Sequence, residues 1–215
     1  MISIVCPSRG RPIQARRMYG SALNTARGEV EVKFYLNNDD PKITAYDVPS
    51  VTGPDMPTAW SWNKLALESR GELIVLGGDD TIFKTVGWDD RLREEMWPDG
   101  IGVLAFNDLR SKGAAPHTCV SRKWIDTLGY FCPFWFHHWY VDTWNVDIAK
   151  RINRFKWLED VVLEHMTFKN NKASMDDTYR RIRDSWIAGR DQAIWAATER
   201  YRAADAEVLR KCVSS

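Results

Sequence analysis

Four consecutive apolar residues, Leu73 to Leu76, lead directly into two glycines and then Asp79 and Asp80. A segment that is apolar at every position is typical of a central strand in a parallel sheet, because helices cover both faces of such a sheet. In open parallel sheets, ligands bind beyond the carboxyl ends of the strands. The sequence therefore predicts a buried strand that presents two carboxylates at the edge where a ligand would bind.

The segments around this strand alternate between strand and helix patterns. Residues 2–6 and 30–36 are strand-like runs, and between them small and apolar side chains recur at helical spacing from Pro12 to Gly28. We expect further strands at residues 101–106, 117–121 and 156–164, and further helices at residues 58–69, 122–128 and 141–152. The alternation predicts an α/β fold with a mostly parallel central sheet flanked by helices.

The character of the sequence changes beyond about Lys169. Three polar residues at 170–172 are followed by large apolar side chains with many interleaved charges, which predicts one or two amphipathic helices. We therefore expect an α/β domain over residues 1–168, with its two halves at 1–112 and 113–168. A C-terminal helical extension would cover residues 169–215.

Composition excludes several broad classes of protein. The 30 basic and 29 acidic side chains, with 44% hydrophobic residues, are typical of a folded globular protein and exclude a disordered one. No apolar run approaches the roughly 20 residues of a membrane helix, and the first residues lack the basic start of a signal peptide, so we expect a cytoplasmic protein. Four scattered cysteines without a CxxC pair predict reduced thiols, at Cys6, Cys119, Cys132 and Cys212.

Asp79 and Asp80 have a chemical interpretation and a simpler one. Two adjacent carboxylates after a buried strand can ligate a hard divalent cation, which commonly takes substrate phosphate oxygens as further ligands. Glycine and aspartate are also favoured in turns, so the segment could be a turn and nothing more.

The order of motifs along the chain resembles a known family. An opening strand that ends in Pro7, Ser8 and Arg9 is followed by a second strand that ends in an Asn/Asp cluster at residues 37–40. A helix that bears Asn63 and a strand that runs into Gly-Asp-Asp come next. In this order, these motifs resemble the nucleotide-sugar half of glycosyltransferase family 2, which has the GT-A fold.

The resemblance covers roughly residues 1–168, so that 1–112 would be the nucleotide-sugar half and 113–168 the acceptor half. It implies an inverting, metal-dependent glycosyltransferase that takes a hexosyl or N-acetylhexosaminyl group from a nucleotide-sugar donor, expected to be a UDP-sugar. It also implies that Asp79 and Asp80 form the acidic metal-binding motif, with Asp80 as the direct ligand of Mn²⁺ or Mg²⁺ on the donor diphosphate.

The resemblance also assigns residues to the donor. Pro7, Ser8, Arg9 and Asp39 would hold the nucleoside, since a carboxylate can accept the N3–H hydrogen bond of uracil. Arg9 or Arg11 could face the diphosphate, because the first 28 residues contain five arginines and no acidic side chain.

Two further positions match the family pattern. Asn63 and Lys64 occupy a position that contacts the donor sugar or phosphate in the family, although a polar helix face would look the same. His165 ends the last expected strand, where some members of the fold place a third metal ligand, and imidazole suits Mn²⁺ better than Mg²⁺. A hydrogen-bonded structural histidine is the alternative.

Residues 131–144 combine seven aromatic side chains with His137, His138 and a single carboxylate, Asp142. Inverting transfer needs a base that takes the proton of the acceptor hydroxyl, and apolar surroundings raise the pKa of a carboxyl group. Family members place an acidic residue, commonly written Glu-Asp, at the start of a helix here, and Asp142 occupies that place without the glutamate. Asp142 is therefore our candidate base, with Asp147, His137 and His138 as alternatives.

Asp142 could instead be only a favourable acid in the first turn of a helix. The aromatic side chains could form core, or a platform on which a flat acceptor stacks, with Trp135 and Trp139 as the surface candidates. Asp176 and Asp177, in the polar joint near Tyr179, could belong to a lid over the donor.

Size and the Pro-Ser-Arg-Gly-Arg opening resemble compact bacteriophage glycosyltransferases, some of which modify hydroxymethylated pyrimidines in DNA. Residues 150–190 hold ten basic and six acidic side chains, a bias compatible with phosphate contacts. Modified DNA is therefore a candidate acceptor. The alternative is a catalytically inactive nucleotide-binding module that acts through a protein or nucleic-acid partner. A nucleotidyltransferase ranks last, because residues 8–11 supply only one glycine.

Overall fold

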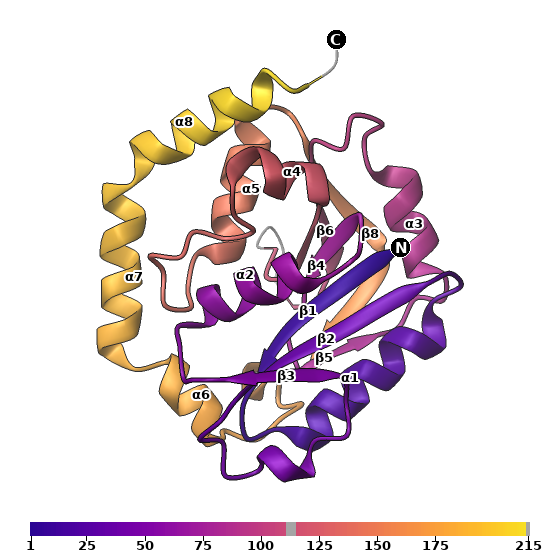
Figure 1. Ribbon diagram of the computed structural model, residues 1–215, viewed down its shortest axis with the longest axis vertical. Coiled ribbons are helices and arrows are strands. Elements are labelled where there is room, and N and C mark those ends of the chain that lie inside the picture. Colours follow the sequence, from indigo (N-terminus) through magenta and orange to yellow (C-terminus); the bar gives the residue numbers. More distant parts are fainter. Residues whose placement is uncertain (111–114, 214–215) are drawn as a thin grey trace.

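The computed structural model describes residues 1–110 and 115–213. Within these ranges the chain forms a mixed sheet with the strand order β3-β2-β1-β4-β7-β6-β8-β5 (Figure 1). The strands are β1 (Ile2–Ser8), β2 (Val30–Asn37), β3 (Ser50–Gly53), β4 (Leu73–Leu76), β5 (Thr81–Phe83), β6 (Val103–Asn107), β7 (Thr118–Ser121) and β8 (Phe155–His165). The helices are α1 (Pro12–Thr25), α2 (Thr58–Glu68), α3 (Trp88–Glu95), α4 (Arg122–Leu128), α5 (Val141–Arg151), α6 (Asp177–Ile182), α7 (Ser185–Ala197) and α8 (Glu199–Arg210), with two short 3-10 helices, η1 (Ile43–Ala45) and η2 (Phe168–Asn170).

The predicted βαβ unit is present and sets the edge of the sheet at which the polar turns meet. β1 runs parallel to both β2 and β4, with Ser8 opposite Leu36 and Val5 opposite Leu76. Pro12 begins α1, where its fixed φ suits a helix start and its missing N–H costs no hydrogen bond. The residues that follow β1, β2 and β4 therefore lie at one edge of the sheet.

The α/β fold with a mostly parallel sheet is confirmed, with antiparallel strands added on one side. β4 pairs in parallel with β1 but antiparallel with β7, and β6 pairs in parallel with β8. The strands expected at 101–106, 117–121 and 156–164 are β6, β7 and β8, with bounds shifted by one or two residues.

The sequence patterns did not predict β3, β5 or α3. β3 lies in a segment that contains three prolines and pairs only with β2, and prolines are tolerated at such an edge. β5 has three residues and is a strand only because it pairs with the end of β8. Neither strand has enough residues to show a period of its own.

Buried side chains cover both faces of the sheet. Ala15, Met18 and Ala22 of α1 pack with Trp88 and Leu92 of α3 on one face. On the other face, α2, α4, α5 and α8 contribute to a second cluster, whose buried aromatic residues include Trp124, Phe136 and Trp144. Much of the aromatic enrichment therefore forms the core.

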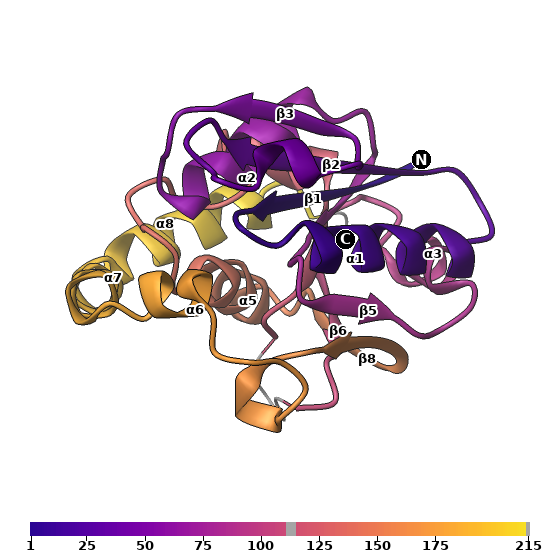
Figure 2. The ribbon, with the colours of Figure 1, turned by 90° about the horizontal axis from the view of Figure 1, so that it is seen from below.

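The C-terminal segment packs against the α/β body along one side (Figures 1 and 2). Ala206 and Leu209 of α8 belong to the core cluster that contains Trp144. The Tyr130 hydroxyl and the Trp144 indole N–H both donate hydrogen bonds to Asp205. Residues 169–213 thus form three helices rather than one or two, and α8 shares a hydrophobic core with the α/β body. The division expected between residues 112 and 113 lies outside the described residues.

Two further sequence expectations concern the whole chain. The cysteines at positions 6, 119, 132 and 212 are free thiols. None of the helices in the described ranges combines the length and the apolar character that crossing a membrane requires.

Asp191 of α7 joins the C-terminal segment to the aromatic segment. Its buried carboxylate accepts hydrogen bonds from the backbone N–H groups of His137, His138 and Trp139, at 2.9, 2.8 and 2.9 Å. Asp191→Ala should lower the free energy of unfolding by about 2–4 kcal/mol, because it leaves buried N–H groups without an acceptor. Urea denaturation followed by tryptophan fluorescence would measure this loss.

Asp177→Ala is the matched control, since Asp177 is an exposed carboxylate on the neighbouring helix. It should change the unfolding free energy by less than about 0.5 kcal/mol. Equal destabilisation by the two variants would contradict the role given to Asp191.

Candidate active site

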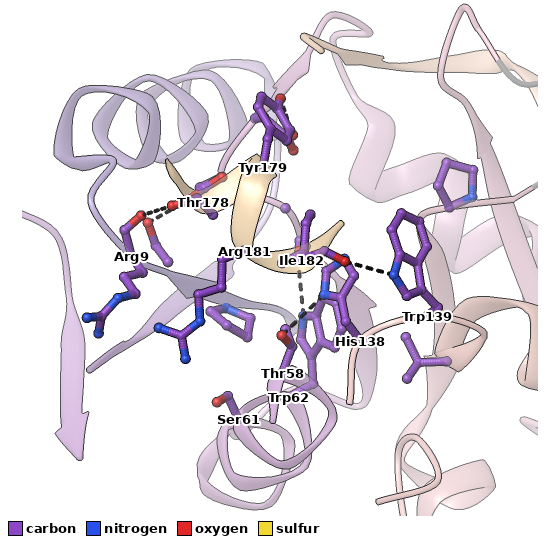
Figure 3. A pocket seen from close by; sticks show the side chains of 18 of the residues that line it. Arg9, Thr58, Ser61, Trp62, His138, Trp139, Thr178, Tyr179, Arg181 and Ile182 are labelled. Atoms are coloured by element: carbon purple, nitrogen blue, oxygen red, sulfur yellow. Dashed lines mark hydrogen bonds between the residues drawn. The ribbon is translucent and has the colours of Figure 1, made fainter. Parts of the chain in front are cut away.

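A cavity of about 330 Å³ lies at the edge of the sheet where the strands end (Figure 3). Its floor is the segment Leu76–Asp80, which follows β4. Its walls come from the ends of β1 and β2, the start of α2, the segment His137–Asp142, the segment after β8, and α6. Parts of the chain far apart in sequence therefore line one cavity.

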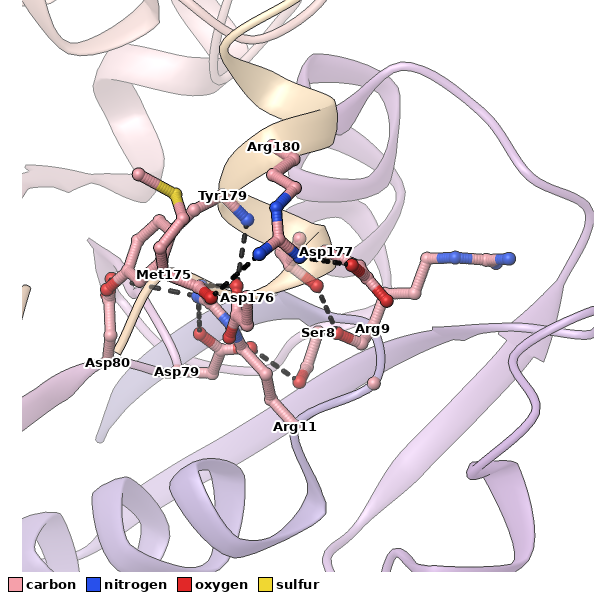
Figure 4. Close-up of polar contacts among 12 residues, drawn as sticks. Ser8, Arg9, Arg11, Asp79, Asp80, Met175, Asp176, Asp177, Tyr179 and Arg180 are labelled. Carbon is pink, nitrogen blue, oxygen red and sulfur yellow. Dashed lines mark hydrogen bonds and ion pairs between the residues drawn. The ribbon is translucent and has the colours of Figure 1, made fainter. Parts of the chain in front are cut away.

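The two aspartates of the floor have different partners (Figure 4). Asp79 accepts hydrogen bonds from the Ser8 hydroxyl at 2.7 Å and from the Arg11 guanidinium at 3.0 Å. Asp80 accepts one from the Tyr179 hydroxyl at 2.8 Å, and its Oδ2 lies 3.4 Å from Nε2 of His165. Asp79 is thus held by the β1–α1 loop, whereas Asp80 faces β8 and α6.

Arg11 is the central cation of this group. Its side chain is buried, and its Nε and Nη2 atoms donate to the two carboxylate oxygens of Asp176, both at 2.7 Å. The guanidinium also lies over the ring of Tyr179, 3.9 Å from the ring centroid. One arginine from the first loop therefore binds Asp79 of the floor together with the N-cap residue of α6.

Burial and neighbouring charges move the pKa values of the two aspartates in opposite directions. Burial, the largest effect, raises the pKa of Asp79 to about 6, with a further rise from the nearby Asp80 charge. Burial acts in the same direction on Asp80, but His165, Arg11 and Tyr179 outweigh it and lower its pKa below the ordinary value. Asp80 is therefore the aspartate that stays ionised over the widest pH range.

His165 is the counter-charge of Asp80. Burial lowers the pKa of the imidazole, but interactions with Asp108 and Asp80 outweigh burial and raise it to about 9. Asp108 follows β6 and reaches the same place from a third strand. The sequence analysis did not select Asp108, although its position directly after a strand is the same signal that selected Asp79.

The spacing of Asp80 and His165 suits two ligands of one divalent ion. Two ligands of one such ion, each at about 2.1 Å, lie roughly 3 Å apart, and the observed 3.4 Å between Oδ2 and Nε2 is close to this spacing. Within residues 1–110 and 115–213, no group of three or more His, Cys, Asp or Glu side chains is arranged to hold a metal ion. The residues present fit two ligands, so a bound ion would need the others from substrate and water.

Part of the expected nucleoside set lines the cavity. Pro7, Ser8 and Arg9 are in its wall. Asp39 is not, but it forms an exposed ion pair with Arg9, which lowers the pKa of Asp39. Thr178 of α6 donates to the Arg9 carbonyl at 2.7 Å, so the β1–α1 loop is fixed from both sides.

Asn63 and Lys64 lie outside the cavity lining. The Asn63 amide group bonds to the backbone at Phe131 and Cys132, which fixes the start of the aromatic segment. Lys64 pairs with Glu68 one turn further along the exposed side of α2. The structure does not bring these two residues to the acidic pair.

The base candidates separate clearly. Asp142 lines the cavity in the first turn of α5, and burial raises the pKa of its carboxyl group. Asp147 is outside the lining and is bound by Arg151 at 2.7 Å and Arg202 at 3.2 Å. Of the alternatives to Asp142, only the two histidines therefore remain beside the cavity.

His137 and His138 both line the cavity. Burial lowers the pKa of His138 to about 4, and its Nδ1 atom lies 3.2 Å from the Thr58 hydroxyl. Of the two aromatic candidates, Trp139 lines the cavity and donates to the Ile182 carbonyl of α6 (Figure 3). Trp135 is outside the lining and packs against Trp144.

Tyr179 was not predicted as a partner of Asp80. A lid role for Asp176 was predicted only from its position in the polar joint. An N-cap aspartate three residues before a tyrosine indicates a helix start, and the structure has this hydrogen bond between Asp176 and the Tyr179 N–H. Nothing in the local sequence indicates that this helix contacts a loop 165 residues earlier.

Neither a known protein-family model nor a curated protein sequence matches the chain. Solved structures do match. A mannosyltransferase from Pyrobaculum calidifontis, in complex with GDP-Man and Mn²⁺, has a TM-score of 0.62 at 12% identity, over 94% of this chain and 77% of that one. TarS residues 1–349 from S. aureus, in complex with UDP-GlcNAc, has a TM-score of 0.61 at 10% identity, over 89% and 69%.

Glucosyl-3-phosphoglycerate synthase from Mycobacterium tuberculosis, in complex with Mg²⁺ and UDP, has a TM-score of 0.58 at 16% identity, over 78% of this chain and 72% of that one. The match to a longer TarS structure spans only 36% of that chain. These TM-scores establish the fold and, at such low identities, the fold alone: the protein has the GT-A fold. The expected resemblance in fold is confirmed, and bacteriophage origin and DNA modification stay predictions.

Removal of Arg11 should destabilise the protein strongly. Arg11→Met leaves buried carboxylates without their cation, and loss of one partner of a buried pair costs about 3–5 kcal/mol. Adding Asp79→Asn should restore part of this loss, because one uncompensated charge is then absent. Urea denaturation of the single and double variants would measure both effects.

Arg16→Met is the control on the same helix, since Arg16 forms an exposed ion pair with Asp47. A surface pair of this kind contributes at most about 1 kcal/mol. If Arg11→Met and Arg16→Met unfolded at the same urea concentration, Arg11 would not be the cation on which the site depends.

Proposed function

We propose that this protein is an inverting glycosyltransferase that takes its sugar from a UDP-sugar. The observation that carries the proposal is that Asp80, His165 and Asp142 line one cavity at the strand ends of a GT-A fold. The first two supply ligands for an ion on a diphosphate, and the third supplies a base with a raised pKa. Supporting structures bind GDP-Man, UDP-GlcNAc and UDP.

The donor would lie across the floor of the cavity. Ser8 and Arg9, with Asp39 behind Arg9, would contact the nucleoside at the ends of β1 and β2. Asp80 and His165 would hold Mn²⁺ or Mg²⁺ together with the donor diphosphate, and the ion would offset the negative charge that develops on the departing nucleotide. Asp79 would keep the floor in place through Ser8 and Arg11 rather than bind the ion.

The transfer step follows from the position of Asp142. Its carboxylate takes the proton of an acceptor hydroxyl while that oxygen forms a bond to the anomeric carbon. The bond between the anomeric carbon and the diphosphate oxygen breaks, and UDP leaves with the electron pair. Attack from the side opposite the leaving group inverts the anomeric centre.

The acceptor enters the proposal only as a class. Trp139 offers an aromatic face within the cavity wall, on which a flat or sugar-like acceptor can stack. A hydroxymethylated pyrimidine in DNA fits this description, as do other hydroxyl acceptors. Mass spectrometry of donor consumption, with a panel of UDP-sugars and with ordinary and hydroxymethylated duplex DNA, would distinguish them. UDP binding without turnover with any acceptor would favour a nucleotide-binding module.

UDP binding should depend on a divalent ion through Asp80. By calorimetry, we expect UDP to bind the wild-type protein at least about tenfold more tightly with Mn²⁺ than with EDTA, because the ion links carboxylate and diphosphate. Asp80→Asn should remove this difference. Asp90→Asn should retain it, because Asp90 of α3 is outside the cavity lining. Equal affinity with Mn²⁺ and EDTA in the wild-type protein would show that donor binding needs no ion.

Transfer should require the ionised form of Asp142. Burial raises the pKa of Asp142. We therefore expect kcat/KM to rise with pH, and the midpoint of this rise should lie above the ordinary aspartate pKa of about 3.9. Asp142→Asn should lower kcat by about 10²- to 10⁴-fold and leave UDP affinity unchanged. Asp147→Asn, on the same helix but outside the cavity, should stay near wild type. Unchanged turnover in Asp142→Asn would assign the base to His137 or His138.

A further inference from the structure

Three cations from three separate segments stand together in the cavity wall. Arg110 follows β6, Lys169 lies in η2 after β8, and Arg183 is the C-cap of α6. We call these three residues the cationic rim. All three are exposed, so each can be reached by a ligand in the cavity.

The cationic rim differs from the other arginines of the cavity in its ion pairing. Those arginines already have carboxylate partners, namely Asp39 for Arg9, Asp79 and Asp176 for Arg11, and Asp55 for Arg181. Arg183 lies over the Phe168 ring, 5.1 Å from its centroid, and forms no ion pair with any carboxylate in the described ranges. Lys169 likewise has no carboxylate partner among those residues. Arg110 has a distant one, since its Nε atom lies 3.8 Å from Asp108, and Asp108 also lies 3.8 Å from His165.

These like charges affect one another. Neighbouring protein atoms remove part of the hydration of Lys169, and this effect, followed by repulsion from Arg110 and Arg183, lowers the pKa of Lys169. Gathering three positive charges of which only Arg110 has a carboxylate nearby is unfavourable in the free protein and makes the local potential favourable for an anion. A phosphate group, with several acceptor oxygens, can accept charge-assisted hydrogen bonds from all three side chains at once.

We propose that the cationic rim binds a phosphate group carried by the acceptor. The proposal rests on the proposed function, since it assigns the substrate class of the same cavity. It makes the acceptor a phosphate ester, in which a hydroxyl lies near Asp142 while the phosphate lies against the rim.

Exposure indicates why the phosphate belongs to the acceptor rather than the donor. Asp80 and His165, which would hold the donor diphosphate, have side chains that are only 13% and 14% exposed. The three rim residues are exposed. A donor held at Asp80 and His165 would leave the rim to a second molecule.

Inorganic phosphate is a suitable probe, because it tests the phosphate site without a known acceptor. Its binding to the protein would be measured by calorimetry, alone and after saturation with UDP and Mn²⁺. We expect phosphate to bind the UDP-saturated protein. Lys169→Ala and Arg183→Ala should each weaken this binding by roughly tenfold and leave UDP affinity unchanged.

Arg180→Ala is the matched control, since Arg180 is on the same helix as Arg183, is exposed, and pairs with Asp177 outside the cavity. It should bind phosphate as the wild-type protein does. Circular dichroism of each variant would verify that the fold is retained.

Three results would overturn the proposal. If UDP abolished phosphate binding, the rim would bind the donor. The same would follow if the rim variants weakened UDP binding as much as phosphate binding. If Arg180→Ala weakened phosphate binding as much as Arg183→Ala, phosphate binding would depend only on the net charge of the protein. Failure of the wild-type protein to bind UDP would instead contradict the proposed function, and phosphate binding measured without UDP keeps these two failures apart.

Discussion

The Arg11 guanidinium compensates the carboxylates that the fold buries at the end of β4. An isolated buried carboxylate is costly, and Asp79 and Asp80 are neighbours in the chain, so their mutual repulsion adds to the cost. Arg11 offsets the charge of Asp79, and His165 and Tyr179 offset that of Asp80. Because Arg11 also binds Asp176, the same interaction ties the first loop of the protein to the start of its C-terminal helices. The shape of the cavity depends on this one network.

The network also gives the two aspartates different partners. Both carboxylate oxygens of Asp79 accept hydrogen bonds, from Ser8 and from Arg11, and these bonds hold it in the floor. Asp80 faces a histidine across 3.4 Å and has a lowered pKa, so it stays ionised, and the proposed function assigns it to the ion. The two aspartates are the same residue type side by side in the sequence, and only their surroundings distinguish them. The base candidate is set apart in a similar way, because Asp142 lines the cavity while Asp147 is held by two arginines.

The sequence predicted those parts of the fold whose signals are local. The strand at Leu73–Leu76, the βαβ unit from Ile2 to Asn37 and the helix beginning at Val141 all carry a pattern of apolar side chains within their own residues. The polar residues after the strand at 73–76 then predicted Asp79 and Asp80 at the edge of the sheet, and the family resemblance implied Ser8 and His165 there. All four residues line the cavity. β3 and β5 escaped prediction because each exists only through pairing with a neighbouring strand.

Chain order and side-chain chemistry alone determined that this protein is an α/β protein with acidic residues at the mouth of its sheet. Tertiary structure decided which of those residues meet. Asn63 looked equivalent to Ser8 as a donor contact, yet its amide group is used by the backbone at residues 131–132. Tyr179 and two residues of the cationic rim, Lys169 and Arg183, reach the cavity from segments that follow the α/β body. The physical reason is that periodicity records how one element faces its core, whereas a site is made by long-range contacts between the ends of elements, which leave no period in the sequence.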